Sequence, residues 1–138
     1  MYKEICNEVG KMVYPVYLVG GAVRDIMLGR DPIDLDFTTP LSPDEIENAI
    51  RRVKRHPYLI GKRFGTVGVK INQKLVEITT FRSEKYEDGN RKPKVEFVKD
   101  ITADLSRRDF TVNAMAFRDG RLIDPFGGKE DLDRKIIK

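Results

Sequence analysis

Two aspartates, Asp34 and Asp36, are one residue apart in a segment, residues 33–38, in which apolar and acidic side chains alternate. This alternation predicts a β-strand that projects both carboxylates to one side and its apolar residues Ile33, Leu35 and Phe37 to the other. Two like charges about 7 Å apart along a strand need a cation between them, or one must take up a proton. Alternatively, the two acids are simply solvated on an exposed strand, because the pattern is common.

A cation held by this carboxylate pair would have oxygen ligands only. Such ligands favour Mg²⁺, which keeps waters and phosphate oxygens of a substrate in its remaining positions. Two such ions suit an in-line displacement at phosphorus. The pair therefore indicates chemistry on a phosphate group.

Two adjacent glycines, Gly20 and Gly21, separate a predicted buried strand at residues 17–19 from a predicted helix at 22–28. A glycine turn at a helix start lets backbone N–H groups approach a phosphate closely, and the helix dipole favours negative charge there. Arg24, in the first helical turn, can add a charge-assisted contact to the phosphate. Taken singly, the glycines are more simply a turn and Arg24 a surface cation. Together with the paired aspartates, they predict a phosphate site beside a metal site.

Other elements are needed to position these residues. Helical spacing and capping signals predict helices at residues 2–11, 42–53 and 106–116. Strand periodicity predicts strands at residues 66–71, 75–81 and 95–98, with a small hairpin at 117–123. The polar residues 83–94 are predicted to form a loop. This order of elements predicts an α+β domain with a mixed β-sheet and flanking helices.

Composition fits one soluble domain. The chain has 138 residues, 40% of them hydrophobic, which is enough for one core. Its net charge of +4, from 26 basic and 22 acidic residues, permits a nucleotide or nucleic-acid partner. The single cysteine, Cys6, excludes an internal disulfide and favours a reducing compartment. Since no signal-peptide or membrane-spanning pattern is present, we expect a cytoplasmic protein.

Five sequence motifs carry a resemblance to a known family. The segment GGAVRDIMLGRDPIDLDFTT, residues 20–39, resembles the signature of the tRNA nucleotidyltransferase (CCA-adding enzyme) and poly(A) polymerase family, within the DNA polymerase beta superfamily. The four further motifs follow in the family's order and extend over nearly the whole chain: RFGTVGV (63–69), VEITTFR (76–82), RRDFTVNAMAF (107–117) and DPFGGKEDL (124–132).

The resemblance implies a polymerase-beta-like head domain that adds CMP and AMP, from CTP and ATP, to the 3′ end of tRNA without a nucleic-acid template. It implies that Asp34 and Asp36 hold two Mg²⁺ ions and that Gly20, Gly21 and Arg24 bind the triphosphate. Two alternatives stay open. The same chemistry could serve poly(A) addition or the addition of only C or only A, or the domain could bind nucleotide or RNA without turnover.

Further roles follow from the same resemblance. Glu77 would be a third catalytic carboxylate, although a cross-strand ion pair is the alternative. Arg108 and Asp109 would recognise the ribose, although Ser106 and Asp109 also resemble a helix capping box. Asn113 would either bind nucleotide or brace the loop.

Three cations near the second and third motifs, Lys62, Arg63 and Arg82, are candidates for phosphate or RNA-backbone contacts. Solvated surface charge is the alternative for each. Members of the family continue into helical neck, body and tail regions, so residues 1–123 are expected to form the catalytic head and 124–138 to begin the connection to the neck. Those regions would be supplied in cis or in trans, or the exposed surface would favour self-association. No residue of this chain is expected to select the base.

Overall fold

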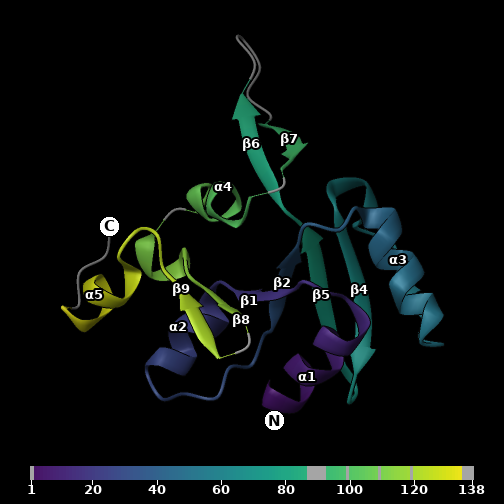
Figure 1. Cartoon of the computed structure of the whole chain (residues 1–138), viewed down its shortest axis with the longest axis horizontal. Helices are drawn as coiled ribbons and strands as arrows, with labels where there is room; N and C mark the ends of the chain where they lie inside the picture. The colour runs from purple at the N-terminus through teal and green to yellow at the C-terminus, as the bar shows by residue number, and fades with distance from the viewer. Residues whose placement is uncertain (1, 87–92, 99, 109, 119, 135–138) are drawn as a thin grey trace.

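A seven-stranded mixed β-sheet forms the centre of the computed structural model, which describes residues 2–86, 93–98, 100–108, 110–118 and 120–134 (Figure 1). The strand order is β3-β4-β5-β2-β1-β8-β9. The strands are β1 (Tyr17–Val19), β2 (Asp36–Thr39), β3 (Pro57–Tyr58), β4 (Thr66–Ile71), β5 (Lys74–Thr80), β8 (Ala116–Arg118) and β9 (Arg121–Ile123). Only β2 and β5 pair in parallel among these described strands; the other pairs are antiparallel. The predicted α+β class with a mixed sheet is confirmed.

Helices flank the sheet. They are α1 (Tyr2–Met12), α2 (Gly21–Met27), α3 (Pro43–Arg52), α4 (Ile101–Ser106) and α5 (Gly128–Asp133), with single 3₁₀ turns η1 (Lys62–Phe64) and η2 (Thr111–Asn113). The start of α3 is fixed by a capping box, in which the Ser42 hydroxyl accepts the Glu45 N–H and the Glu45 carboxylate accepts the Ser42 N–H. None of the described helices is long and apolar enough to cross a membrane.

The main core lies on one face of the sheet, under α1 and α3. Leu18 of β1 and Phe37 of β2 are paired in register and are both buried there. Their strand neighbours Val19 and Asp36, also paired in register, project to the opposite face because side chains alternate along a strand. On that face Val19 packs in a smaller cluster with Leu105 of α4. The sheet thus has one apolar face and one face that is free to carry polar chemistry.

The strand predicted at 33–38 was wrong at its start. It begins only at Asp36, because residues 33 and 34 form a bend and none of residues 33–35 pairs with a strand. Ile33 is consequently 79% exposed instead of packing beside Leu35 and Phe37.

The helix predicted at 106–116 is also wrong. Helix α4 starts five residues earlier, because Asp100 is its N-cap and accepts the Thr102 N–H. It ends at Ser106, and the chain then makes only the single turn η2 before β8. The capping signal that belongs to this helix is therefore Asp100, not Ser106.

The segment predicted as a loop at 83–94 contains strand structure. β6 (Arg82–Tyr86) and β7 (Pro93–Phe97) pair as a separate antiparallel hairpin that projects from the body of the molecule (Figure 1). Residues 87–92, between them, lie outside the described part. The strand predicted at 95–98 is present but begins at Pro93.

Candidate active site

The two aspartates lie on the same side of the chain at the start of β2. Asp36 is the first residue of β2, and Asp34 lies in the bend two residues before it. Both side chains are exposed, while Leu35 between them is only 5% exposed and belongs to the main core. The bend therefore preserves the alternation that the strand prediction required of these two residues.

The charges of Asp34 and Arg108 both act on the carboxyl group of Asp36 and change its pKa. Its pKa is raised, first because protein atoms displace water from its carboxylate and further because the Asp34 carboxylate is close; the Arg108 guanidinium opposes both effects. A like charge that raises a pKa favours protonation or the binding of a cation. The carboxylate pair is thus a place where a cation would relieve repulsion.

Glu77 is the register partner of Asp36 across the parallel β2–β5 pair, and its side chain is exposed. Paired residues project to the same face of a sheet, so Glu77 lies on the face of the aspartates. Among the described residues, however, no three acidic, histidine or cysteine side chains lie close enough together to hold one metal ion. Two carboxylates still fit Mg²⁺, because waters and substrate oxygens complete its coordination. The role of Glu77 as a third carboxylate stays a prediction.

The glycine turn lies between β1 and α2. Gly20 has φ 74° and ψ −146°, a conformation open essentially to glycine alone. Arg24 folds back over this turn, since its Nη2 lies 3.2 Å from the position that a Cβ on Gly21 would take. Arg24 Nη1 also donates to Oδ1 of Asn113 at 3.3 Å, and its Nη2 lies 3.4 Å from Oδ1 of Asp25. The turn, Arg24 and Asn113 are therefore brought together.

Arg108 connects this turn with the aspartates. Its Nη1 lies 3.6 Å from the position of a Cβ on Gly20, and its charge acts on the Asp36 carboxylate. Burial and the neighbouring Arg107 lower the pKa of Arg108, and Asp104 and Asp36 oppose that shift. Arg24 and Arg108 thus bring two guanidinium groups to the glycine turn beside the carboxylate pair. Asp109, the predicted partner of Arg108 in ribose recognition, lies outside the described residues.

Arg82 lies close enough to Arg108 for its charge to lower the pKa of that residue. Its Nη1 donates to the Phe64 carbonyl at 2.9 Å. Arg63 stacks its guanidinium 4.7 Å from the centre of the Phe64 ring. Contacts of Arg82 and Arg63 with RNA or phosphate stay predictions.

Lys62 forms ion pairs with two acidic residues of the protein. Its Nζ lies 2.6 Å from Asp44 and 2.7 Å from Glu47, both on α3. These ion pairs join η1 to α3, so the Lys62 ammonium is held by two carboxylates of the protein itself; its contact with phosphate or RNA stays a prediction.

Sequence reasoning missed Asp104, which is fully buried in α4. Its Oδ1 accepts the backbone N–H of Arg82 at 2.9 Å and lies 3.5 Å from Nε of Arg107, while its Oδ2 lies 3.7 Å from Nη2 of Arg108. The available signal was an acid three and four residues before two arginines, the spacing at which helical side chains meet.

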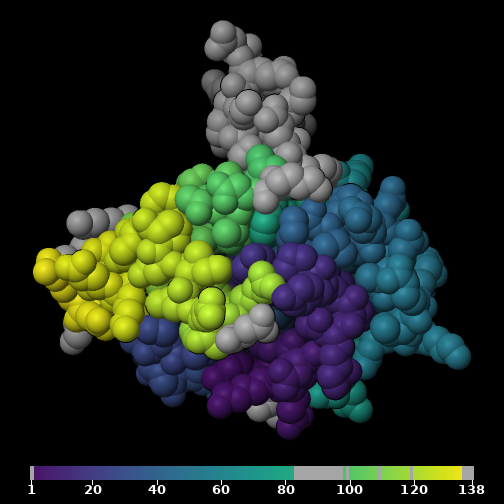
Figure 2. Space-filling view, in the orientation of Figure 1, coloured from purple at the N-terminus to yellow at the C-terminus, as the bar shows by residue number. Residues whose placement is uncertain are grey.

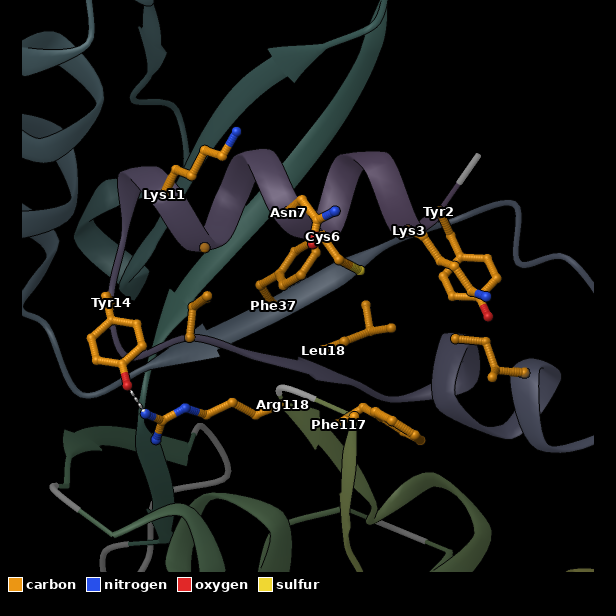
Figure 3. Close-up of a pocket in the computed structure, with 14 residues that line it drawn as sticks. Tyr2, Lys3, Cys6, Asn7, Lys11, Tyr14, Leu18, Phe37, Phe117 and Arg118 are labelled. Carbon is orange, nitrogen blue, oxygen red and sulfur yellow. Dashed lines mark hydrogen bonds between the residues drawn. The ribbon is translucent and has the colours of Figure 1, made fainter.

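Two cavities are close to these elements. One of about 250 Å³ is lined by residues 33–35, which include Asp34, and by residues 74–76 of β5. The other, of about 610 Å³, lies between α1 and β8, with Leu18 and Phe37 at its floor (Figure 3). At its edge Arg118 donates to the Tyr14 hydroxyl, and the space-filling view shows α1 and the β8–β9 hairpin side by side (Figures 2 and 3). Since Leu18 and Phe37 alternate with Val19 and Asp36, this larger cavity is not part of the carboxylate site.

Comparisons with known proteins converge on one family. A family model described as the poly(A) polymerase head domain matches residues 16–138. The CCA-adding enzyme of Staphylococcus aureus (strain Newman) is 41% identical over 138 residues, which cover 99% of this chain and 34% of that enzyme.

Solved structures agree in fold. The crystal structure of the Bacillus stearothermophilus CCA-adding enzyme in complex with CTP is 39% identical with a TM-score of 0.78, over 98% of this chain and 31% of that one. A tRNA nucleotidyltransferase complexed with a primer tRNA and an incoming ATP analogue is 36% identical with a TM-score of 0.72, over 100% of this chain and 38% of that one. The chain thus spans about a third of the length of the relatives it matches.

Proposed function

The chain belongs to the family of poly(A) polymerase head domains, which are nucleotidyltransferases, and from this premise we propose that it is the catalytic head domain of a tRNA nucleotidyltransferase. The proposed reaction transfers CMP and AMP from CTP and ATP to the 3′-hydroxyl of tRNA. The observation that carries the proposal is the placement of Asp34 and Asp36 on one side of the chain, with Arg108 acting on Asp36 from beside the glycine turn.

In this proposal the arginines bind the substrate and the aspartates hold the metal. Arg24 binds the triphosphate at the Gly20–Gly21 turn, where its fixed guanidinium group matches phosphate oxygens. Asp34 and Asp36 would hold two Mg²⁺ ions, and the chemistry that these ions would supply is activation of the attacking hydroxyl and neutralisation of charge on the triphosphate. The 3′-hydroxyl loses its proton to water and its oxygen forms a bond to the α-phosphorus. The bond between the α-phosphorus and the oxygen that bridges to the β-phosphate breaks, and pyrophosphate leaves.

The proposed roles of the remaining site residues follow from the residues that lie next to them and from the family resemblance. Glu77 is proposed as a third carboxylate because it pairs in register with Asp36. Arg108 with Asp109 is proposed to contact the ribose, and Asn113 to hold Arg24. Arg82 and Arg63 are proposed to contact the RNA backbone.

The rest of the enzyme is proposed to be helical neck, body and tail regions, in cis or in trans, that bind tRNA and select the base. Residues 124–138 are proposed to begin the connection to them. A function on tRNA would place the protein in the cytoplasm.

Incorporation of labelled CMP and AMP into tRNA lacking its 3′ CCA, measured with this chain together with the proposed helical neck, body and tail regions, tests this proposal. Asp34→Ala and Asp36→Ala should each lower the rate of incorporation by about 100-fold or more. Each substitution would remove a carboxylate ligand of the metal ions that stabilise the transition state. Asp31→Ala is the matched control, because Asp31 is an exposed aspartate in the same segment outside the proposed site, and it should retain activity.

Three outcomes would contradict the proposal. Equal rates for Asp34→Ala and the unaltered chain would remove the aspartates from catalysis. ATP binding without incorporation into any RNA would instead identify a nucleotide-binding module. Faster addition of AMP to an RNA other than tRNA would assign the same chemistry to poly(A) addition.

A further inference from the structure

Helix α5 is fixed directly against η2, the turn that precedes β8. A Cβ on Gly128 would lie 2.1 Å from the carbonyl oxygen of Thr111, so the two backbones are in contact and only glycine fits. The hydroxyl of Thr111 donates to Oδ2 of Asp131 at 2.6 Å, and Asp131 is only 9% exposed. Backbone contact and a buried charge-assisted hydrogen bond therefore join the two elements.

The start of α5 is itself held in place. The Asp124 carboxylate accepts the N–H of Gly128 at 2.6 Å and the N–H of Lys129 at 2.9 Å. Two hydrogen bonds to one carboxylate satisfy N–H groups that a helix start leaves without a helical partner. Asp131 is thus presented to Thr111 from a fixed helix.

The other end of η2 reaches the candidate active site. Asn113, two residues after Thr111, accepts a hydrogen bond from Arg24 through its side-chain oxygen. Because η2 is one short turn, a shift of Thr111 shifts Asn113 with it. A continuous set of contacts then runs from Asp131 through Thr111 and Asn113 to the guanidinium over the glycine turn.

We infer that Gly128 and Asp131 are positioning residues for Arg24: they hold η2 so that Asn113 keeps this guanidinium over the glycine turn, and they thereby set the affinity for the triphosphate. This inference rests on the proposed function, because it assigns Arg24 to the triphosphate. It also gives the DPFGGKEDL motif a role at the site without any contact to the nucleotide.

The test compares binding of Mg·ATP with binding of AMP, using the 138-residue chain. Thr111→Val removes the hydroxyl at nearly constant volume and should weaken Mg·ATP binding about fivefold, the effect of losing one hydrogen bond. AMP binding should change by less than about twofold, since AMP lacks two of the three phosphates of the group proposed to bind Arg24. Asp131→Asn should follow the same pattern. Thr102→Val, on the exposed side of α4, is the matched control and should leave both affinities unchanged.

A double variant separates positioning from general loosening of the fold. If Thr111 acts only through Arg24, Thr111→Val should weaken Mg·ATP binding no further when Arg24 is already alanine. Gly128→Ala should show the same selectivity where circular dichroism confirms that it folds.

Three results would show whether the inference fails alone or whether the proposed function on which it rests fails as well. If Arg24→Ala weakens Mg·ATP binding but Thr111→Val and Asp131→Asn do not, the inference is overturned and the proposed function stands. Equal weakening of Mg·ATP and AMP by Thr111→Val would also overturn it. Absence of Mg·ATP binding by the unaltered chain would overturn the proposed function, and this inference with it.

Discussion

Asp104 shows how one buried side chain organises the cations of the site. Its carboxylate lies within 3.7 Å of two guanidinium groups, on Arg107 and Arg108, and accepts the first N–H of β6. Both arginines are themselves largely buried. Without the acid, two guanidinium groups would repel one another in a place with little water.

We expect Asp104→Ala to lower the free energy of unfolding by about 3 kcal/mol, the usual cost of removing one partner of a buried ion pair. Chemical denaturation followed by circular dichroism measures this change. Asp133→Ala removes an exposed aspartate of α5 and should change stability by less than about 0.5 kcal/mol. Similar small losses for both variants would show that the arginines do not depend on Asp104.

Residue type and spacing were sufficient to predict that several residues of the candidate site lie close together. Asp34, Asp36, Gly20 and Arg24 lie within 17 residues of one another, counted from 20 to 36, so local geometry nearly dictates their proximity. Asp104 acts on Arg82 across 22 residues of chain, and nothing local indicates that contact. Burial of a charged residue is a property of tertiary packing, which a single sequence does not display.

At the scale of elements, helix α3 illustrates a structure that local sequence determines. Its capping box and Pro43 fix its start, and its buried residues Ile46, Ala49 and Ile50 recur at helical spacing. The predicted start of this helix is confirmed. Helix α4 was misplaced by contrast, because Ser106 offered a competing cap and the true cap, Asp100, follows the β6–β7 hairpin.

Loss of the α3 cap has a definite expected cost. Ser42→Ala removes the acceptor for the Glu45 N–H and should lower the free energy of unfolding by about 1 kcal/mol. Thermal unfolding measures the loss. Ser106→Ala serves as control, since Ser106 donates to a carbonyl at the end of α4 and caps no helix start; its cost should be smaller. An equal loss in both variants would mean that the capping box contributes nothing of its own.

Two parts of the fold, the β6–β7 hairpin and strand β3, could not be predicted from their own residues. The polar composition of residues 83–94 favours a loop, yet β6 and β7 satisfy their backbone hydrogen bonds by pairing with each other outside the main sheet. β3 has only two residues, too few for any periodicity, and is defined by its pairing with β4. Strand pairing decided both cases.

At the scale of the whole molecule, the chain has a proposed site for triphosphate and metal but no proposed element for reading a base. It spans about a third of the relatives it matches. Directed hydrogen bonds to base edges are what distinguish one base from another. The proposed helical regions would supply them.

The 138-residue chain should therefore bind the four ribonucleoside triphosphates with nearly equal affinity, within about threefold, because only the shared triphosphate and ribose are recognised. Competition against a fluorescent ATP analogue measures the four affinities. Inorganic triphosphate is a useful control, since it competes through the phosphates alone. A preference of more than about tenfold for CTP and ATP would place base selection within these residues.

The parallel pairing of β2 with β5 also bears on how the protein folds. Thr38 and Thr79, joined by a side-chain to backbone hydrogen bond across these strands, are 41 residues apart, and the intervening chain forms α3, β3 and β4. Pairing of such distant segments costs loop entropy before any contact compensates for it, so it tends to be slow. Asp36 and Glu77 would consequently face each other only once β5 has paired with β2, and a nascent chain that has not reached β5 would hold both aspartates but not the strand that aligns them.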